Sequence, residues 1–351
     1  MIRIALLPGD GIGPEVTGEA RRVLEAAAAA GLAELSFETF PHGADHFLAT
    51  GETLGDEAFA RLRDGFDAIL LGAVGDPRVP DHRHARDILL GLRFRLDLYA
   101  NLRPARLRLP ELSPLRGAAE RPFDVTIVRE NTEGFYAGAG GVLREGTPGE
   151  VAVADGLATR VGVERIVRAA FALARREGRG RVTLADKANA VPHLFGLWRR
   201  VFRAVAAEHP EIEAEEAYVD AVAMRLVREP ERFEVIVTEN LLGDILSDLA
   251  CELAGGIGLA PSANLNPGRH ALYEPVHGSA PDLAGTGTAN PVGAILSAAL
   301  LLAGAGAAEA AARVEEAVDA ALRGGIRTPD TGGDRSTRDV GAWIADRVRG
   351  G

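Results

Sequence analysis

The fold class is decided by the stretch Ile2-Arg3-Ile4-Ala5-Leu6-Leu7-Pro8-Gly9-Asp10-Gly11-Ile12-Gly13-Pro14. It predicts a strand over Ile2–Leu7, a glycine-rich turn, and a helix that Pro14 can begin, because proline suits the first helical turn. The Ala-rich, amphipathic sequence that follows extends this helix to about Ala30. A strand that passes directly into a helix is typical of strand–helix–strand units, so we expect parallel strands.

The same alternation continues along the chain. Further strands are predicted at Leu35–Phe40, Ala68–Leu71, Ile127–Val128, Val182–Leu184, Ile212–Val219 and Val235–Thr238, and helices at Asp56–Arg63, Val163–Glu177, Leu194–Glu208, Asp244–Leu253 and within Pro291–Leu322. The Gly- and Pro-dense segment Gly255–Gly287 is predicted as a long functional loop region. Together these elements predict an α/β protein whose partly parallel sheet is flanked by helices.

The composition excludes several classes of protein. The 351 residues suffice for two domains, and 47% hydrophobic with 25% charged residues is typical of a globular protein. The 39 basic and 50 acidic residues give a net charge of −11, which disfavours nucleic acid as a partner. The apolar stretch from Pro291 to Ala308 is too short for a membrane span and predicts a buried helix. The single cysteine, Cys251, excludes an internal disulfide and fits a cytoplasmic location.

The turn Gly9–Gly13 resembles part of a dinucleotide-binding fingerprint, and Glu34 lies about 20 residues on, as that motif requires. However, Pro14 holds the position of the third glycine and cannot provide close glycine packing. We therefore interpret the stretch as a tight turn and expect any cofactor to bind elsewhere.

Lys187 is the only lysine among the 39 basic residues. In so Arg-rich a chain, a remaining lysine is a candidate for a task that arginine cannot perform, because a lysine can lose its proton and act as a base. Chance retention is an equally good explanation at this point.

Asp244 and Asp248 are four residues apart, so both carboxylates lie on one helical face. With Asp220 as a third oxygen donor, they would suit Mg²⁺ or Mn²⁺. A solvated acidic face is the alternative, and it is disfavoured by the apolar neighbours Ile245 and Leu246 and by the absence of a nearby basic residue in the helix.

Three arginines, Arg93, Arg103 and Arg129, lie in apolar or turn sequences. A guanidinium binds a carboxylate through two parallel hydrogen bonds, so a cluster of them predicts a substrate with more than one carboxylate. Each arginine alone is better explained by a structural ion pair, because the chain is so rich in arginine.

Five motifs together resemble the β-decarboxylating hydroxyacid dehydrogenases, the isocitrate/isopropylmalate dehydrogenase family, most closely its isopropylmalate branch. They are Arg129–Tyr136, Asp186–Asn189, Tyr218–Ala221, Gly243–Asp248 and Glu274–Asp282, in the order of the family and over nearly the whole chain. The resemblance implies a two-domain isopropylmalate dehydrogenase-like fold with a shared sheet. The first, cofactor-side domain would be 1–97 plus 255–351, and the second, metal-, substrate- and dimer-forming domain would be 98–254.

The resemblance also implies the chemistry: NAD- and metal-dependent oxidation and decarboxylation of a 3-substituted malate. Tyr136, Lys187 and Asp220 would be catalytic, with Lys187 the base and Tyr136 the acid. Asp220, Asp244 and Asp248 would hold Mg²⁺ or Mn²⁺, and Arg93, Arg103 and Arg129 the carboxylates. NAD would bind at Glu274, His277, Gly278, Ser279, Ala280, Asp282 and Asn290. The active site would be shared in a homodimer, with Lys187 and Asp220 supplied by the partner subunit.

The substrate's side group is predicted from the helix before Arg93. Leu89 and Leu90 favour an apolar group, as in 3-isopropylmalate, whose product is 4-methyl-2-oxopentanoate in leucine biosynthesis; ordinary helix core is their alternative role. The segment Asn131–Gly134 is more similar to the isocitrate and homoisocitrate branches, and Arg86 could reach an anionic group. Isocitrate, homoisocitrate, tartrate or a related malate is therefore the alternative substrate. A non-catalytic regulatory subunit is disfavoured, because the metal aspartates, the lysine and the tyrosine are all present.

Overall fold

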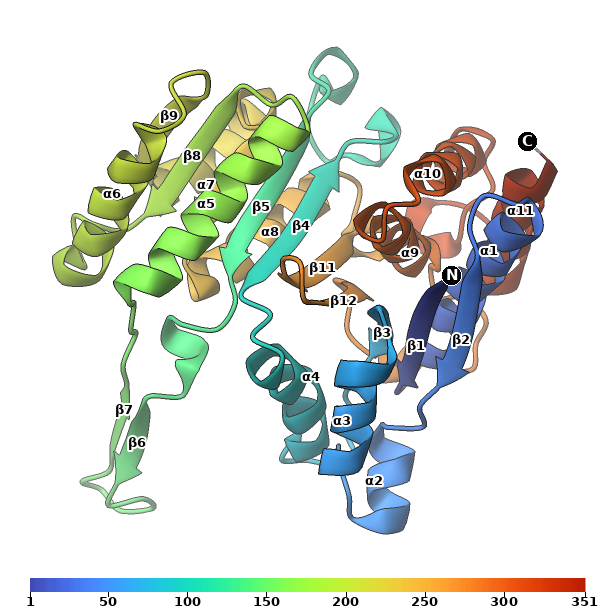
Figure 1. Ribbon diagram of the computed structural model, residues 1–351, viewed down its shortest axis with the longest axis horizontal. Helices are drawn as coiled ribbons and strands as arrows, with labels where there is room; N and C mark the ends of the chain where they lie inside the picture. The colour runs from blue at the N-terminus through green and yellow to red at the C-terminus, as the bar shows by residue number, and fades with distance from the viewer. Residues whose placement is uncertain (351) are drawn as a thin grey trace. The chain divides into compact units, whose positions relative to one another are not determined.

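The computed structural model describes residues 1–350, which form two compact units (Figure 1). Unit 1 comprises Met1–Leu98, Leu107–Ala119 and the residues from Cys251 onward. Unit 2 comprises Tyr99–Arg106 and Glu120–Ala250. The division of the chain into folding domains at 97/98 and 254/255 stays a prediction.

Unit 1 contains five strands in the order β2-β1-β3-β12-β11. β1 pairs in parallel with β2 and β3, and β12 in parallel with β3, whereas β11 and β12 form an antiparallel hairpin. Their bounds are β1 Ile2–Gly9, β2 Leu35–Thr39, β3 Ala68–Ala73, β11 Pro261–Asn266 and β12 His270–Pro275.

Helices pack against the strands of unit 1. Alternate residues of a strand point to opposite faces, and Ala5, Leu7, Ile69 and Leu71 share one core cluster with residues of α3 and α4. α1 and α9 also pack on these strands, while α11 packs on α1 and α10 packs on α9. The bounds are α1 Gly13–Ala29, α2 Ala44–Thr50, α3 Asp56–Gly65, α4 Arg83–Arg95, α9 Val292–Gly304, α10 Ala308–Arg323 and α11 Thr337–Gly350.

The main strands of unit 2 are five, in the order β4-β5-β10-β8-β9, and among these β4 alone runs antiparallel to its neighbour. α5 and α6 lie on one face of these strands and α7 and α8 on the other (Figure 1). The bounds are β4 Ala100–Arg106, β5 Asp124–Glu130, β8 Arg181–Asp186, β9 Glu213–Tyr218, β10 Val235–Thr238, α5 Arg160–Arg176, α6 Pro192–Ala206, α7 Val219–Arg228 and α8 Asn240–Leu253.

This arrangement of unit 2 gathers the candidate residues at one edge. The carboxyl ends of parallel strands meet at the same edge of a sheet, where α/β proteins commonly bind ligands. Arg129 lies near the end of β5, Lys187 directly follows β8, Asp220 lies one residue into α7 after β9, and α8 follows β10. The hairpin of β6 (Gly140–Leu143) and β7 (Val151–Ala154) projects away from these strands (Figure 1).

The α/β class and the helix-flanked, mostly parallel strands are confirmed, and the predicted elements recur with shifted ends. Pro14 stands in the first turn of α1, after Gly9 and Gly11 at φ of +72° and +58°. The prediction of a long loop over Gly255–Gly287 was wrong, because this segment contains β11 and β12. Its prolines and asparagines obscured a buried hairpin, in which Asn264 is fully buried and hydrogen-bonded.

No helix among residues 1–350 is long and apolar enough to cross a membrane. The apolar stretch that begins at Pro291 is instead the buried helix α9, as predicted.

Candidate active site

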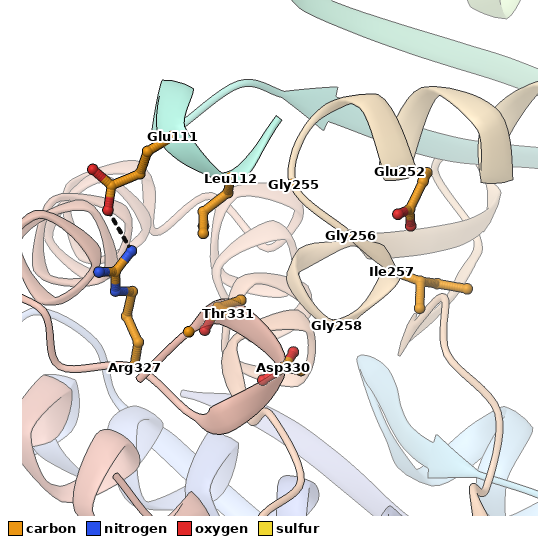
Figure 2. A pocket seen from close by; sticks show the side chains of 11 residues that line it. Glu111, Leu112, Glu252, Gly255, Gly256, Ile257, Gly258, Arg327, Asp330 and Thr331 are labelled. Carbon is orange, nitrogen blue, oxygen red and sulfur yellow. Dashed lines mark hydrogen bonds and ion pairs between the residues drawn. The ribbon is translucent and has the colours of Figure 1, made fainter. Parts of the chain in front are cut away.

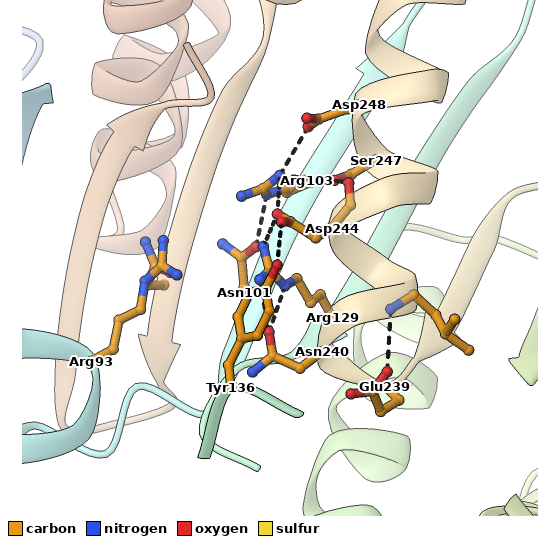
Figure 3. A network of polar contacts seen from close by, with 12 residues as sticks. Arg93, Asn101, Arg103, Arg129, Tyr136, Glu239, Asn240, Asp244, Ser247 and Asp248 are labelled. Atoms are coloured by element: carbon orange, nitrogen blue, oxygen red, sulfur yellow. Dashed lines mark hydrogen bonds and ion pairs between the residues drawn. The ribbon is translucent and has the colours of Figure 1, made fainter. Parts of the chain in front are cut away.

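The acidic face of α8, formed by Asp244 and Asp248, meets two arginines from neighbouring strands (Figure 3). Arg103 of β4 reaches Asp248 Oδ1 at 3.2 Å and Asp244 Oδ1 at 3.3 Å through its Nη1 atom. Arg129 of β5 pairs with Asp244 through its own Nη1. The helix carries no basic residue near these aspartates, as the sequence indicates, but the folded chain brings Arg103 and Arg129 to them from β4 and β5. We call these four residues the α8 cluster.

Neutral side chains fix the orientation of both arginines in the α8 cluster. Asn101 accepts a hydrogen bond of 2.9 Å from Arg103 Nε, and Ser247 Oγ accepts one of 2.9 Å from Nη1. Asn240 Oδ1 accepts from both Nε and Nη2 of Arg129, at 3.0 and 2.7 Å. Amide and hydroxyl partners carry no charge, so they hold both guanidinium groups in place without neutralising them.

Tyr136 belongs to the same site. Its hydroxyl donates to Asp244 Oδ2 at 3.0 Å, and the Arg129 guanidinium lies 5.4 Å from its ring centroid. Burial, followed by the negative charge of Asp244, raises the pKa of Tyr136 above its usual range. The phenol therefore keeps its proton at neutral pH and can serve as a proton donor.

The α8 cluster fits a divalent cation by the chemistry of its donors. Burial and the charge of Asp244 raise the pKa of Asp248, although Arg103 acts in the opposite direction. Arg103 and Arg129 offset the mutual repulsion of the two carboxylates, and the four-residue spacing on one helix places both carboxylates on the same face, where they can act as cation ligands together. Carboxylate oxygens are the preferred protein ligands of Mg²⁺ and Mn²⁺.

Lys187 and Asp220 form a separate pair in unit 2. Lys187 Nζ lies 2.6 Å from Asp220 Oδ1, and the side chains are 31% and 59% exposed. The hydrogen bond from Lys187 lowers the pKa of Asp220. Within residues 1–350 no group of three metal-binding side chains is assembled, so one chain does not bring Asp220 to Asp244 and Asp248.

Arg93, the third predicted carboxylate-binding residue, lies in unit 1. Its Nη2 donates to Glu274 Oε1 at 2.9 Å, and Asn264 Nδ2 donates to the same oxygen at 2.8 Å. Arg93 and Glu274 are both buried, and the pair joins α4 to β12. The helix with Arg93 is thereby tied to the strand that begins the predicted cofactor loop.

α4 also carries the residues predicted to contact the side group of the substrate. Leu89 is half-buried and packs against the core cluster of unit 1, whereas Leu90 is half-buried outside that cluster. Arg86 is exposed on the same helix. Leu90 is therefore better placed than Leu89 to contact a ligand, because its side chain does not pack against this core cluster.

The predicted cofactor loop rests on the Gly9–Gly13 turn. Ser279 O accepts a hydrogen bond of 2.8 Å from Ile12 N, and a Cβ on Gly11 would stand only 2.0 Å from the same oxygen. Burial lowers the pKa of His277 in this loop, while Gly278 and Asp282 are exposed. The glycine turn therefore supports the loop.

Unit 1 contains a cavity of about 620 Å³ (Figure 2). Asp330 lines this cavity and accepts a 2.9 Å hydrogen bond from Asn290 Nδ2. Arg327 and Glu111 pair at 2.6 Å on another part of its wall. Asp330 and Arg327 were not predicted from the sequence as cavity-lining residues. The glycine-rich run Gly255–Gly258, which also lines the cavity, was the sequence feature that could have indicated it.

Comparisons with known proteins agree with one another. The profile described as "Isocitrate/isopropylmalate dehydrogenase" matches residues 3–344. A 3-isopropylmalate dehydrogenase of Thermobifida fusca is 48% identical, with 99% of this chain and 98% of that protein aligned. One of Clavibacter sepedonicus is 51% identical over 98% and 97%. The solved isocitrate dehydrogenase of Methylococcus capsulatus, 38% identical, superposes with a TM-score of 0.90 over 99% and 100% of the two chains.

Proposed function

The chain belongs to the isocitrate/isopropylmalate dehydrogenase family and is a decarboxylating dehydrogenase, and from this we propose that its substrate is 3-isopropylmalate. The product would be 4-methyl-2-oxopentanoate, in leucine biosynthesis. The α8 cluster with Tyr136 carries the proposal, because it combines carboxylates for a metal, arginines for a substrate carboxylate and a phenol in one place. The names of the similar proteins support the substrate.

Each residue has a proposed task. Lys187, as a neutral amine, removes the proton of the 2-hydroxyl and becomes an ammonium group, while Asp220 accepts a hydrogen bond from Nζ. Tyr136 donates the proton that the product carbon needs after CO₂ leaves. Arg93, Arg103 and Arg129 bind the malate carboxylates, and Leu89 and Leu90 contact the apolar group. Bound to Asp244, Asp248 and Asp220, Mg²⁺ or Mn²⁺ would supply Lewis acidity.

NAD is the proposed hydride acceptor. Asp282 is exposed and could accept hydrogen bonds from a ribose 2′-hydroxyl while repelling a 2′-phosphate. The proposed binding residues are Glu274, His277, Gly278, Ser279, Ala280, Asp282 and Asn290, and the cavity lined by Asp330, which accepts a hydrogen bond from Asn290, offers room for part of the cofactor. Comparable kcat/KM with NADP⁺ would contradict this choice.

A homodimer is proposed on two observations. First, Lys187 and Asp220 are partly exposed, and residues 1–350 assemble no group of three metal-binding side chains around Asp220. Second, unit 2 exposes apolar residues on α7, α8 and the β6–β7 hairpin, among them Met224, Val227, Ile245, Leu143 and Val153. A second copy of the chain would cover such residues. The cytoplasm is the proposed location, because the chain has one cysteine.

The deciding experiment is a panel of 3-substituted malates with NAD⁺ and Mn²⁺, followed by NADH formation. We expect 3-isopropylmalate to exceed isocitrate by roughly 10- to 200-fold in kcat/KM, and Leu90→Arg to narrow or invert this ratio. Preference for isocitrate or another anionic malate, lost in Arg86→Ala, would overturn the substrate and make Arg86 the specificity residue. No oxidation of any malate would overturn the enzyme proposal.

A further inference from the structure

Arg199 of α6 contacts Asp186, the residue before Lys187, and Tyr218, which lies two residues before Asp220. Its Nε and Nη2 donate to the two carboxylate oxygens of Asp186, at 2.5 and 3.0 Å. Its guanidinium carbon lies 5.0 Å from the ring centroid of Tyr218, two residues before Asp220. One side chain therefore contacts the ends of both β8 and β9.

The contact with Asp186 controls the backbone on both sides of Lys187. Asp186 is fully buried, and its Oδ1 atom also accepts a 2.9 Å hydrogen bond from Ala188 N. The residues before and after Lys187 are thus joined through one carboxylate, whose charge Arg199 balances. Without Arg199, this buried carboxylate would lose the cation that is hydrogen-bonded to it, and the turn would have to move to hydrate it.

Stability alone is a poor explanation for this ion pair. Asp186 is fully buried while Arg199 is 22% exposed, and an ion pair that removes the hydration of its carboxylate usually contributes little more to stability than well-packed apolar residues. What the pair does provide is direction, since a planar guanidinium with two parallel hydrogen bonds has one orientation relative to its carboxylate. A fixed orientation of Asp186 also orients the backbone of Lys187, the next residue. This matters because Lys187 Nζ must lie within hydrogen-bonding distance of the proton that it removes.

We infer that Arg199 is a positioning residue, which keeps the Lys187–Asp220 pair assembled through its contacts with Asp186 and Tyr218. The inference rests on the proposed roles of Lys187 and Asp220. It adds that the pair is prepared within one subunit, before it meets the remainder of the site.

Arg203 provides a matched control one helical turn further along α6. It also binds a carboxylate through two hydrogen bonds, at 2.7 and 2.8 Å, but its partner is Glu216 and its side chain is 65% exposed. Glu216 also lies 3.7 Å from Arg199 Nε, but Arg203→Gln leaves both hydrogen bonds between Arg199 and Asp186 in place.

The test uses the fact that Lys187 is the only lysine, so lysine labelled with ¹³C at Cε gives one side-chain NMR signal. We expect the two Hε protons to be inequivalent and the side chain to be rigid in the unaltered protein and in Arg203→Gln. In Arg199→Gln the protons should become equivalent through motional averaging. kcat should fall about 10-fold or more with KM for NAD⁺ nearly unchanged, because misplacement of a catalytic group lowers the chemical step.

The double variant Arg199→Gln/Asp186→Asn removes both charges and so tests the idea even if Arg199→Gln does not fold. It too should show a mobile Lys187. An ordered Lys187 signal and unchanged kcat in either folded Arg199 variant, even with a lower Tm, would overturn the inference and leave Arg199 a structural residue. If the unaltered protein oxidises no malate, the proposed function fails, and the NMR comparison still decides whether Arg199 orders Lys187.

Discussion

The α8 cluster and the Lys187–Asp220 pair both belong to unit 2, yet they are built in opposite ways. In the α8 cluster, buried arginines held by amides surround the two aspartates. Lys187 and Asp220 instead have each other as charge partners at a largely exposed position. This difference is what the proposed homodimer requires: the α8 cluster would receive the ligand, and the Lys187–Asp220 pair would complete the site of the other subunit.

The largest effect is expected from the exposed pair. Lys187→Arg keeps the charge and can still pair with Asp220, but arginine does not release its proton. We expect kcat to fall about 100- to 10,000-fold, the contribution typical of a general base. Steady-state kinetics measures it, and an unchanged Tm would show that the loss is chemical. Near-native kcat would show that Lys187 is not the base, and Asp220 would be tested next.

The two regions can be separated by mixing inactive variants. Lys187→Arg damages only the exposed pair, and Asp244→Asn damages only the α8 cluster. If subunits exchange at random after mixing and brief unfolding, half of the dimers are hybrids with one intact site, so about a quarter of the normal activity should return. A mixture that stays as inactive as its components would contradict a shared site.

Removal of one carboxylate from the α8 cluster should change metal dependence more than turnover. In Asp248→Asn, the Mn²⁺ concentration for half-maximal activity should rise on the order of 100-fold, since changes around a metal ligand already cost 10- to 100-fold. Titration of the variant with Mn²⁺ measures this shift. Glu252→Gln, one turn further along α8, is the control and should leave the Mn²⁺ requirement unchanged.

The smallest expected effect is on the pH dependence of the free energy of unfolding in the absence of metal. Burial and Asp244 raise the pKa of Asp248, so the folded protein holds this proton to a higher pH than the unfolded chain does. The free energy of unfolding therefore falls as pH rises through the raised pKa. At pH 7 Asp248→Asn should stabilise the protein, by no more than about 1 kcal/mol because solvent screens this half-exposed carboxylate.

Denaturant unfolding in EDTA should show this gain vanish toward about pH 3, where both proteins are neutral at this position. Asp220 has the opposite sign, because Lys187 lowers its pKa. Its contribution to stability is present above the ordinary pKa of aspartate and is lost as pH falls through the lowered value. A gain for Asp248→Asn that grew on acidification would contradict the inferred direction.

Local sequence was sufficient for the fold class and for several candidate residues. Alternation of apolar strands and helices requires only neighbouring residues, and so does the four-residue spacing of Asp244 and Asp248. Lys187 was conspicuous by composition alone. The hairpin of β11 and β12 was not predicted, because prolines and asparagines are typical of loops. These residues form strands here because β11 pairs with β12 and β12 pairs with β3.

The sequence by itself determined which residues could bind a metal, a carboxylate or a proton. Only the tertiary structure decided their partners. Arg103 is 145 positions from its partner Asp248, and Arg129 is 115 positions from Asp244. Arg93 is 181 positions from its partner Glu274. Charges close in space but distant in sequence leave no local pattern, because the register between strands and the packing of helices on them set their distances.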